Sequence, residues 1–313
     1  MAKSASKSFK LKRAYELAFS PDAKVVATIG RDVIFWSTAT RKRLLSVHPL
    51  SHPSHIDFSP DGASLAIKST SGRIVILDAA KGRIVTDCAN QTEGEGAPVY
   101  FTRDGHSVVD ASWDGTLSIR SASDEEVTHR ESVGGMVSNL SANADRRFFA
   151  YTIGRRAPSP KVSPPHDLIV FRRWPFARSE SAILPVARPF IRAIALSPSA
   201  TRLAVFYGAP PDPLEVIDVS TGRVLASAHI GSGGSGHSLA WSPDESMLGC
   251  VVDGGISLFD SSSLRRTHMI PLSYPAFVTF SADQRFLGLG SWNDSRVLDM
   301  SELAPFEVHA NAA

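Results

Sequence analysis

Phe58-Ser59-Pro60-Asp61-Gly62 is the stretch of sequence that decides the fold, because similar stretches return along the whole chain. Each copy begins with an aromatic residue or leucine and continues with serine or threonine, and most copies then hold proline, aspartate or both. Successive copies are 39, 43, 39, 56, 45 and 39 residues apart, since they begin at Phe19, Phe58, Phe101, Leu140, Leu196, Trp241 and Phe280. A unit that returns roughly every 40 residues is the mark of a repeat protein.

Each copy predicts a reversal of the chain between two short apolar runs. Proline fixes its own φ, and the aspartate side chain hydrogen-bonds the backbone two residues further on. In the first unit the runs that follow the reversal are 25–29, 33–36 and 43–47, with polar turns between them. No segment shows the 3.6-residue period of an amphipathic helix. Each unit therefore predicts a four-stranded antiparallel sheet.

A single sheet of this size cannot bury both of its faces. Seven sheets in series can do so by packing face to face around an axis. We therefore predict an all-β fold, a seven-bladed β-propeller of four-stranded antiparallel blades, forming one domain over residues 7–313. Residues 1–6 are expected to be a disordered tail.

The repeat resembles that of the WD-repeat family over nearly the whole chain, through the Ser-Pro-Asp-Gly turn and the ending of the third run. At the family's Trp-Asp position stand Trp36-Ser37, Leu77-Asp78, Arg120-Ser121, Phe171-Arg172, Ile217-Asp218, Phe259-Asp260 and Leu298-Asp299. Units three and four depart from the pattern, and the family's Gly-His pair is missing throughout. Arg120 occupies a normally apolar position, where we expect an acidic neighbour.

The resemblance implies that strands from the two chain ends complete the last blade, which leaves no open sheet edge. Two segments compete for the outer strand of that blade, residues 9–12 and residues 306–309. We expect the N-terminal segment to close the ring.

Composition excludes several classes of function. The chain has 33 Lys and Arg against 31 Asp and Glu, so its net charge of +2 gives no support to bulk binding of nucleic acid or anionic membranes. No stretch approaches the ~18 apolar residues of a membrane span, and the first residues lack the apolar core of a secretory signal. Cys88 and Cys250 are expected to stay reduced. We expect a cytoplasmic protein that is monomeric on its own.

The resemblance also implies which residues face a partner. Turns between second and third strands, and turns that join blades, would line one face around the channel. Trp113 and Trp292 hold matching turn positions in units three and seven, and Trp and Arg are enriched at binding hot spots. The competing interpretation is an indole folded back over the blade edge. Further candidates on this face are Arg31, Phe190, Arg192 and Tyr274.

Unit four is longer than the others because of an insertion, residues 154–167, between its second and third strands. The insertion holds four prolines together with Arg155, Arg156, Lys161 and His166. Proline-rich sequence favours an extended conformation that fits a partner's groove, so we include these four side chains among the partner-binding candidates. A tolerated surface loop is the alternative.

Charge is balanced in the whole chain but not locally. Residues 87–131 hold ten acids and three bases, whereas residues 154–192 hold eight bases and two acids. Neighbouring blades of opposite charge favour oriented docking with a charged partner. Solvated faces are the competing interpretation, and some of these charges must pair across the boundary between blades.

Three other sequence patterns give only weak indications of a metal, phosphate or enzyme site. His48, His52 and His55 lie close in sequence, but with no cysteine and no carboxylate before Asp57 we expect exposed loop histidines and no metal. The glycine-rich segment 231–236 lacks the Lys-Ser/Thr ending of a phosphate loop. The candidates for an enzyme site at the channel mouth, which are more simply turn residues, are Asp32, Asp114, Asp253 and Asp294.

The leading hypothesis is thus a non-catalytic scaffold that presents a face of loops to one or more proteins, without a cofactor. A propeller enzyme with a site at the channel mouth is the second hypothesis. Nucleic-acid docking through residues 154–192 is the third.

Overall fold

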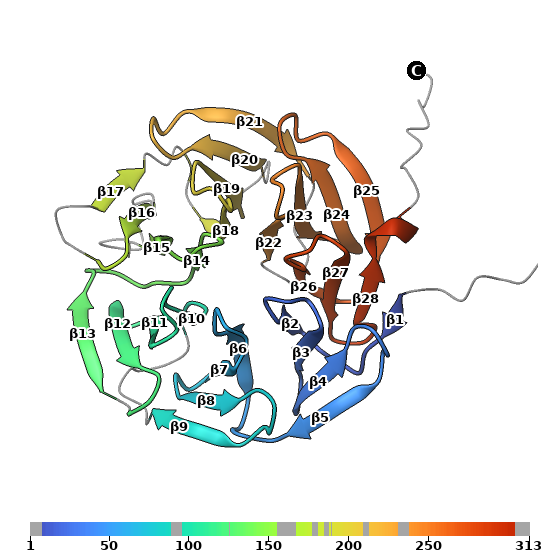
Figure 1. Cartoon of the computed structure of the whole chain (residues 1–313). Helices are drawn as coiled ribbons and strands as arrows, with labels where there is room; N and C mark the ends of the chain where they lie inside the picture. The colour runs from blue at the N-terminus through green and yellow to red at the C-terminus, as the bar shows by residue number, and fades with distance from the viewer. Residues whose placement is uncertain are drawn as a thin grey trace, which may run out of the picture.

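Seven four-stranded antiparallel sheets stand as blades around a central axis in the computed structural model (Figure 1). The structure describes residues 8–88, 96–124, 126–154, 167–176, 181–184, 188, 190–208, 213–230 and 238–303. Within these residues the one helical element is the short 3-10 helix η2 (Met300–Glu302). The predicted all-β fold and the predicted number of blades are confirmed.

The first three blades follow chain order from the axis outward. Blade 1 consists of β2 (Glu16–Phe19), β3 (Val25–Ile29), β4 (Val33–Ser37) and β5 (Arg43–Val47). Blade 2 consists of β6 (Pro53–Phe58), β7 (Ser64–Ser69), β8 (Ile74–Asp78) and β9 (Ile84–Cys88). Blade 3 consists of β10 (Tyr100–Phe101), β11 (Ser107–Ala111), β12 (Thr116–Ser121) and β13 (Val127–Ser132).

The next three blades repeat the same order. Blade 4 consists of β14 (Leu140–Ala142), β15 (Phe148–Ile153), β16 (Leu168–Arg173) and β17 (Ser181–Leu184). Blade 5 consists of β18 (Ile191–Leu196), β19 (Arg202–Tyr207), β20 (Pro213–Asp218) and β21 (Val224–His229). Blade 6 consists of β22 (Leu239–Trp241), β23 (Met247–Val252), β24 (Gly255–Asp260) and β25 (Arg266–Pro271).

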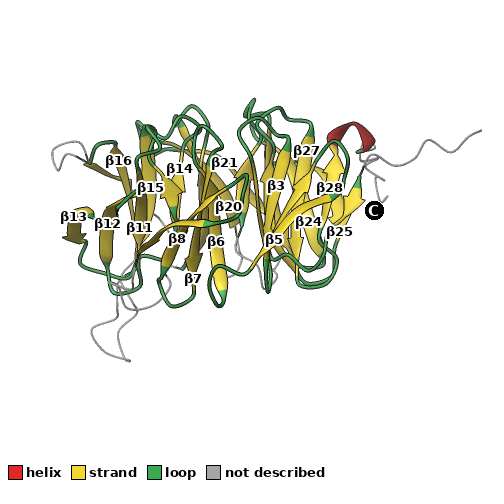
Figure 2. Ribbon diagram, turned by 60° about the horizontal axis from the view of Figure 1, so that its bottom comes forward, coloured by secondary structure: helices red, strands yellow, loops and turns green. Residues whose placement is uncertain are grey.

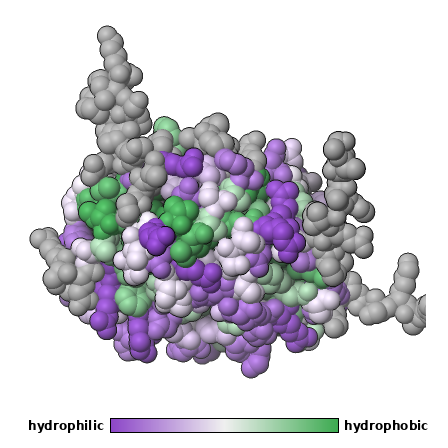
Figure 3. Space-filling view, turned by 90° about the horizontal axis from the view of Figure 1, so that it is seen from above, coloured by the Kyte–Doolittle hydropathy of each residue, from purple (hydrophilic) through white to green (hydrophobic). Residues whose placement is uncertain are grey.

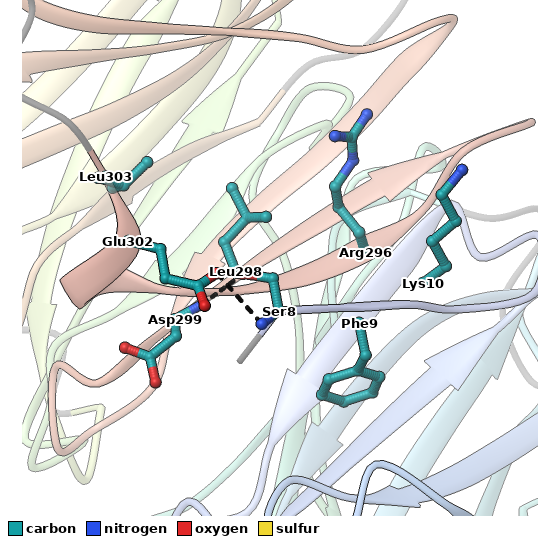
Figure 4. Close-up of a pocket in the computed structure, with 8 residues that line it drawn as sticks. All are labelled: Ser8, Phe9, Lys10, Arg296, Leu298, Asp299, Glu302 and Leu303. Carbon is teal, nitrogen blue, oxygen red and sulfur yellow. Dashed lines mark hydrogen bonds between the residues drawn. The ribbon is translucent and has the colours of Figure 1, made fainter. Parts of the chain in front are cut away.

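Blade 7 is closed by the N-terminal segment. Its strands are β26 (Pro275–Phe280), β27 (Phe286–Ser291), β28 (Arg296–Asp299) and, on the outside, β1 (Phe9–Lys10). Phe9 pairs with Val297. The hydroxyl of Ser8 donates to Glu302 at 2.6 Å, so η2 also holds this strand in place (Figure 4). The expected closure is therefore confirmed, while residues 1–6 and the competing segment 306–309 lie outside the described residues.

Side-chain hydrogen bonds explain why the repeated turn has its sequence. In blade 2 the Ser59 hydroxyl donates to Asp61 Oδ1 at 2.5 Å, and the same oxygen accepts from the backbone N–H of Ala63 at 2.9 Å. Gly62 then adopts φ +74°, a conformation that glycine reaches without strain. The same bond between hydroxyl and carboxylate holds four further turns, at Ser20–Asp22, Thr102–Asp104, Ser242–Asp244 and Ser281–Asp283.

The core lies between the blades. Second and third strands are covered on both faces, so they are nearly continuous apolar runs; in β7, Leu65, Ala66 and Ile67 are all fully buried. Figure 2 shows the strands running between two faces, where the turns gather. Cys88 and Cys250 are both buried and are not joined in a disulfide.

Strand pairing corrects one position in the repeat. Val108 pairs with Arg120 in blade 3, and Phe149 pairs with Arg172 in blade 4. Arg172, and not Phe171, therefore holds the position of Trp36, because the long insertion before β16 hides the true register from sequence counting. Arginines thus replace the large apolar residue in two successive blades, and both are buried.

Arg146 joins three neighbouring blades near their innermost strands. It belongs to the turn between β14 and β15, and its Nη2 donates to Asp57 Oδ1 at 3.0 Å and to the Phe58 carbonyl at 3.1 Å. Its Nη1 donates to the Phe101 carbonyl at 2.9 Å. One side chain thereby ties blades 2, 3 and 4 together.

Candidate protein-docking surface

A hollow of about 860 Å³ opens at the junction of blades 3, 4 and 5. Trp113, from the turn between β11 and β12, lines it together with Met136 from the connection to blade 4. Phe190 and Arg192, from the connection to blade 5 and the start of β18, line the other side. Three candidates from the sequence, Trp113, Phe190 and Arg192, thus line one hollow.

Large apolar side chains around this hollow are open to solvent. The exposed fraction is 49% for Trp113, 48% for Met136 and 57% for Phe190. Large apolar side chains that gather at one exposed place often mark an interaction surface. The Trp113 side chain is thus about half exposed and lines the hollow, and its role in partner binding stays a prediction. Met136 lies in the turn 132–136 that joins blades 3 and 4, one of the inter-blade turns expected on this face, but the sequence did not single out its side chain as a candidate.

The backbone at Phe190 is held in a conformation that bulky residues avoid. Its φ is +61°, in the left-handed region. Its carbonyl oxygen accepts a hydrogen bond from the Gly208 N–H at 2.7 Å, which anchors the turn to the end of β19. Strained residues of this kind cluster at ligand-binding sites, where the surrounding structure maintains them.

Arg192 is presented by a bulge in β18. Ile191 pairs with Tyr207 and Ala193 pairs with Phe206, so Arg192 is the extra residue between them. Its guanidinium carbon lies 6.0 Å from the centre of the Phe206 ring. A Cβ atom at Gly208 would lie 2.5 Å from Arg192 Nε, so this glycine makes room for the guanidinium.

Asp167 supports the strand that carries Arg192. It ends the long insertion and lines the hollow, and its Oδ2 accepts a hydrogen bond from the Ile191 N–H at 3.0 Å. The other candidates of the insertion, Arg155, Arg156, Lys161 and His166, lie outside the described residues.

Tyr274, in the connection to blade 7, lies at a second, smaller hollow of about 460 Å³. Tyr274 lines it, with 66% of its surface exposed, and Asp253 and Asp294 line it too. Trp292 is 53% exposed but stacks on Tyr15, with ring centres 4.6 Å apart. The indole thus packs partly against blade 1, and its role in partner binding stays a prediction.

The remaining candidates lie apart from both hollows. Arg31 is exposed in the turn between β3 and β4, where its carbonyl oxygen contacts His48 Nδ1 at 3.1 Å. Asp114 is a turn residue, since its carboxylate accepts from the Thr116 N–H at 2.8 Å. Asp32 contacts His48 Nδ1 at 3.3 Å.

The expectation of three exposed loop histidines was wrong for His55. It lies within strand β6, with 19% of its side chain exposed, because its Nδ1 hydrogen-bonds Glu16 Oε2 at 2.9 Å across blades 1 and 2. In the described part of the chain, no three His, Cys, Asp or Glu side chains come together as a metal site would require. Nor does any helix of that part have the length and apolar character to cross a membrane.

Oppositely charged segments do pair across a blade boundary, as expected. Arg172 of blade 4 donates through Nη1 to Glu131 of blade 3, and its guanidinium lies 4.8 Å from the Phe176 ring centre. Arg120 differs: its Nε and Nη1 are buried, and neither has a hydrogen-bond partner among the described residues. Within the part of the chain that the structure describes, no carboxylate therefore bonds to these two atoms of Arg120.

Apolar side chains also reach solvent on the outer rim, away from the face of loops. Figure 3 views the rim over β17, β21 and β25 and shows apolar groups set among polar ones. Among the described residues of the whole ring, the large apolar side chains that are exposed on outermost strands belong to four blades and are Leu44, Ile84, Val85, Ile183, Val224 and Leu225.

Solved structures with the same fold cover almost the whole chain. "Structure of U3-55K" matches with a TM-score of 0.77 at 16% identity, over 94% of this chain and 98% of that one. "Crystal structure of RRP9 WD40 repeats" matches with a TM-score of 0.76 at 17% identity, over 93% and 97%. Hydrazine synthase of Kuenenia stuttgartiensis matches with a TM-score of 0.77 at 13% identity, over 96% and 99%.

No family model and no curated protein matches the sequence. The chain is a seven-bladed β-propeller with the fold of WD-repeat proteins and a strongly divergent repeat. Because a hydrazine synthase shares the same architecture, fold alone does not separate a scaffold from an enzyme.

Proposed function

We propose that this protein is a non-catalytic interaction scaffold that docks a protein partner in the hollow between blades 3 and 5. The observation that carries the proposal is the meeting of three solvent-exposed large apolar side chains, Trp113, Met136 and Phe190, beside Arg192. Tryptophan and arginine are the residue types most enriched where partner proteins bind tightly.

The geometry also suits a rigid docking surface. Phe190 and Arg192 are held by backbone hydrogen bonds and a bulge, and Trp113 projects from a turn between two paired strands. Side chains that are already in place lose little freedom on binding, which preserves affinity. That the protein acts in the cytoplasm, and as a monomer until it meets its partner, stays a prediction from composition.

The proposal is tested by quantitative affinity capture from the native source. Trp113→Ala and Phe190→Ala are each expected to reduce recovery of the same partner at least tenfold, because loss of a hot-spot side chain costs about 2 kcal/mol or more. The matched control is Leu225→Ala, which removes an equally exposed apolar side chain from the rim strand β21 and should leave capture intact.

Thermal melting of all three variants checks that the ring stays folded. If both Trp113→Ala and Phe190→Ala melt like the wild type and still capture the same partner in undiminished amount, docking at this hollow is contradicted.

A further inference from the structure

We infer that a small monovalent anion, of the size of chloride, binds between blades 2 and 3 against the guanidinium of Arg120. The inference goes beyond the proposed function and does not depend on it. It follows from a buried arginine whose enclosed nitrogens have no hydrogen-bond partner among the residues that the structure describes.

Arg120 lies on the face of blade 3 that packs against blade 2. Its cross-strand neighbour, Val108, belongs to an apolar cluster together with Ala66 and Ile76 of blade 2. Only 2% of the surface of Arg120 is exposed. A guanidinium keeps its proton at any ordinary pH, so burial cannot neutralise it. A charge enclosed in this way requires a partner of opposite charge.

Blade 4 shows how the protein meets this requirement elsewhere. Arg172 holds the same place there as Arg120 holds in blade 3. Its Nη1 donates to the carboxylate of Glu131 from the preceding blade, and its Nη2 donates to the Phe176 carbonyl at 2.9 Å. At this interface the chain itself supplies the anion.

Blade 2 has no carboxylate at the corresponding place. Cys88 of blade 2 occupies the position that Glu131 has in blade 3. Each lies opposite the first apolar residue of the third strand, which is Ile74 in blade 2 and Leu117 in blade 3. Cysteine is shorter than glutamate, and a thiol ordinarily carries no charge at neutral pH. A diffusible anion beside Arg120 would therefore take the role that Glu131 has at the next interface.

A second buried group on the same face offers a further donor. Ser118 stands two residues before Arg120 on strand β12, so both side chains point toward blade 2. Its hydroxyl is fully buried and has no hydrogen-bond partner in the described part of the chain. The same holds for Oδ2 of Asp110, which lies opposite Ser118, but the charge of this carboxylate is offset by Lys68 Nζ, 2.5 Å from Oδ1.

The balance of charge favours an anion over water at this place. Lys68 and Asp110 cancel each other, and Asp57, whose Oδ2 accepts from a backbone N–H of blade 3, is bound by Arg146. The charge of Arg120 is left over from these pairs. Water would satisfy its N–H groups but leave its charge unmatched, whereas an anion satisfies both. Because Arg120 is almost completely enclosed, the anion must be small.

The test compares thermal melting of the full-length protein in sodium chloride and in sodium gluconate at equal ionic strength. Gluconate is much larger than chloride and serves as the anion that does not enter. A ligand that binds only the folded state raises the melting temperature. The wild type should therefore melt higher in about 0.2 M chloride, by on the order of 2 °C or more.

Two variants show whether Arg120 causes the difference. Arg120→Leu should melt at the same temperature in both salts, and leucine suits the position because Leu77 holds it in blade 2. Arg103→Leu removes the same charge from an exposed turn of the same blade and should keep the effect of chloride. Equal melting of the wild type in both salts, or a difference that persists in Arg120→Leu, would overturn the inference.

A crystal structure of the protein grown in sodium bromide locates the ion independently of stability. Bromide replaces chloride and is recognised by its anomalous scattering. The expected result is an anomalous peak within hydrogen-bond distance of Arg120 Nε or Nη1. A water molecule in contact with these nitrogens, without an anomalous peak, would overturn the inference and leave the proposed docking of a protein partner unaffected.

Discussion

Lys68 lies between blades 2 and 3 with its ammonium surrounded by acceptors. Its Nζ donates to Asp110 Oδ1 at 2.5 Å and to the carbonyls of Ala97 and Ala111, each at 2.9 Å. Both charged side chains are completely buried. A buried ion pair of this kind contributes little net stability, but each partner depends on the other to offset the cost of leaving water.

Replacing only Lys68 or only Asp110 should therefore strongly destabilise the fold. Lys68→Met is expected to lower the free energy of unfolding by about 3–5 kcal/mol, because Asp110 keeps a buried charge without a counter-ion. Urea denaturation at neutral pH measures the difference. The double variant Lys68→Met/Asp110→Leu should regain most of the loss, and a single variant as stable as the wild type would refute this account of the pair.

Strand β1 has only two residues, as β10 has, and it closes the ring. It contributes two paired residues, and Leu11 continues it by donating its N–H to the Ser295 carbonyl at 2.8 Å. Leu11 is also buried in a cluster with Leu17, Val26 and Val297, so it joins blade 1 to blade 7. Without β1, strand β28 would present a row of unpaired backbone groups, which favours pairing with another chain.

Deletion of residues 1–11 should consequently lower the melting temperature by several degrees and cause self-association. Sedimentation at several concentrations would detect the association. A synthetic peptide of residues 8–13, added in excess, should reverse both effects by pairing with β28, whereas a scrambled peptide should not. An unchanged melting curve together with a monomeric truncated chain would show that β1 does not hold the ring closed.

For the molecule as a whole, repetition gives many carboxylates the same environment. The hydroxyl of Ser20 holds the pKa of Asp22 at about 2, and the hydroxyl of Ser263 does the same for Asp260 in the turn after β24. The hydroxyl of Ser59 lowers the pKa of Asp61 in the corresponding turn of blade 2. All three carboxylates are charged and hydrogen-bonded at neutral pH.

A carboxyl group whose pKa is lower in the folded state stabilises the fold above its unfolded pKa, here 3.8, and loses that contribution as pH falls through the folded value. The contribution of these turns should therefore stay constant from pH 7 to pH 5 and disappear between about pH 4 and pH 2. Melting temperatures of wild type and Asp22→Asn/Asp260→Asn should differ at pH 7 and converge near pH 2. A difference that persists at pH 2 would contradict this origin.

The sequence predicted the ring well because the ring is made by local signals. Reversals such as Ser59-Pro60-Asp61 form bonds within a few residues, so their spacing alone gives the number of blades. Contacts between distant segments had no such signal. The pairing of Lys68 with Asp110 and the position of Met136 depend on how blades pack, and Arg172 was placed correctly only when β15 supplied its partner.

Ser8 and η2 lie together on blade 7, which stands across the axis from blades 3 and 4 (Figure 1). A tag, a surface linker or a fused domain attached at Ser8 or at η2 would therefore lie far from Trp113 and Phe190. Immobilisation through a group attached at Ser8 or at Glu302 should keep the apolar hollow accessible to a partner as large as a folded protein. The same arrangement would let one side of the ring be anchored while the proposed partner protein binds on the opposite side.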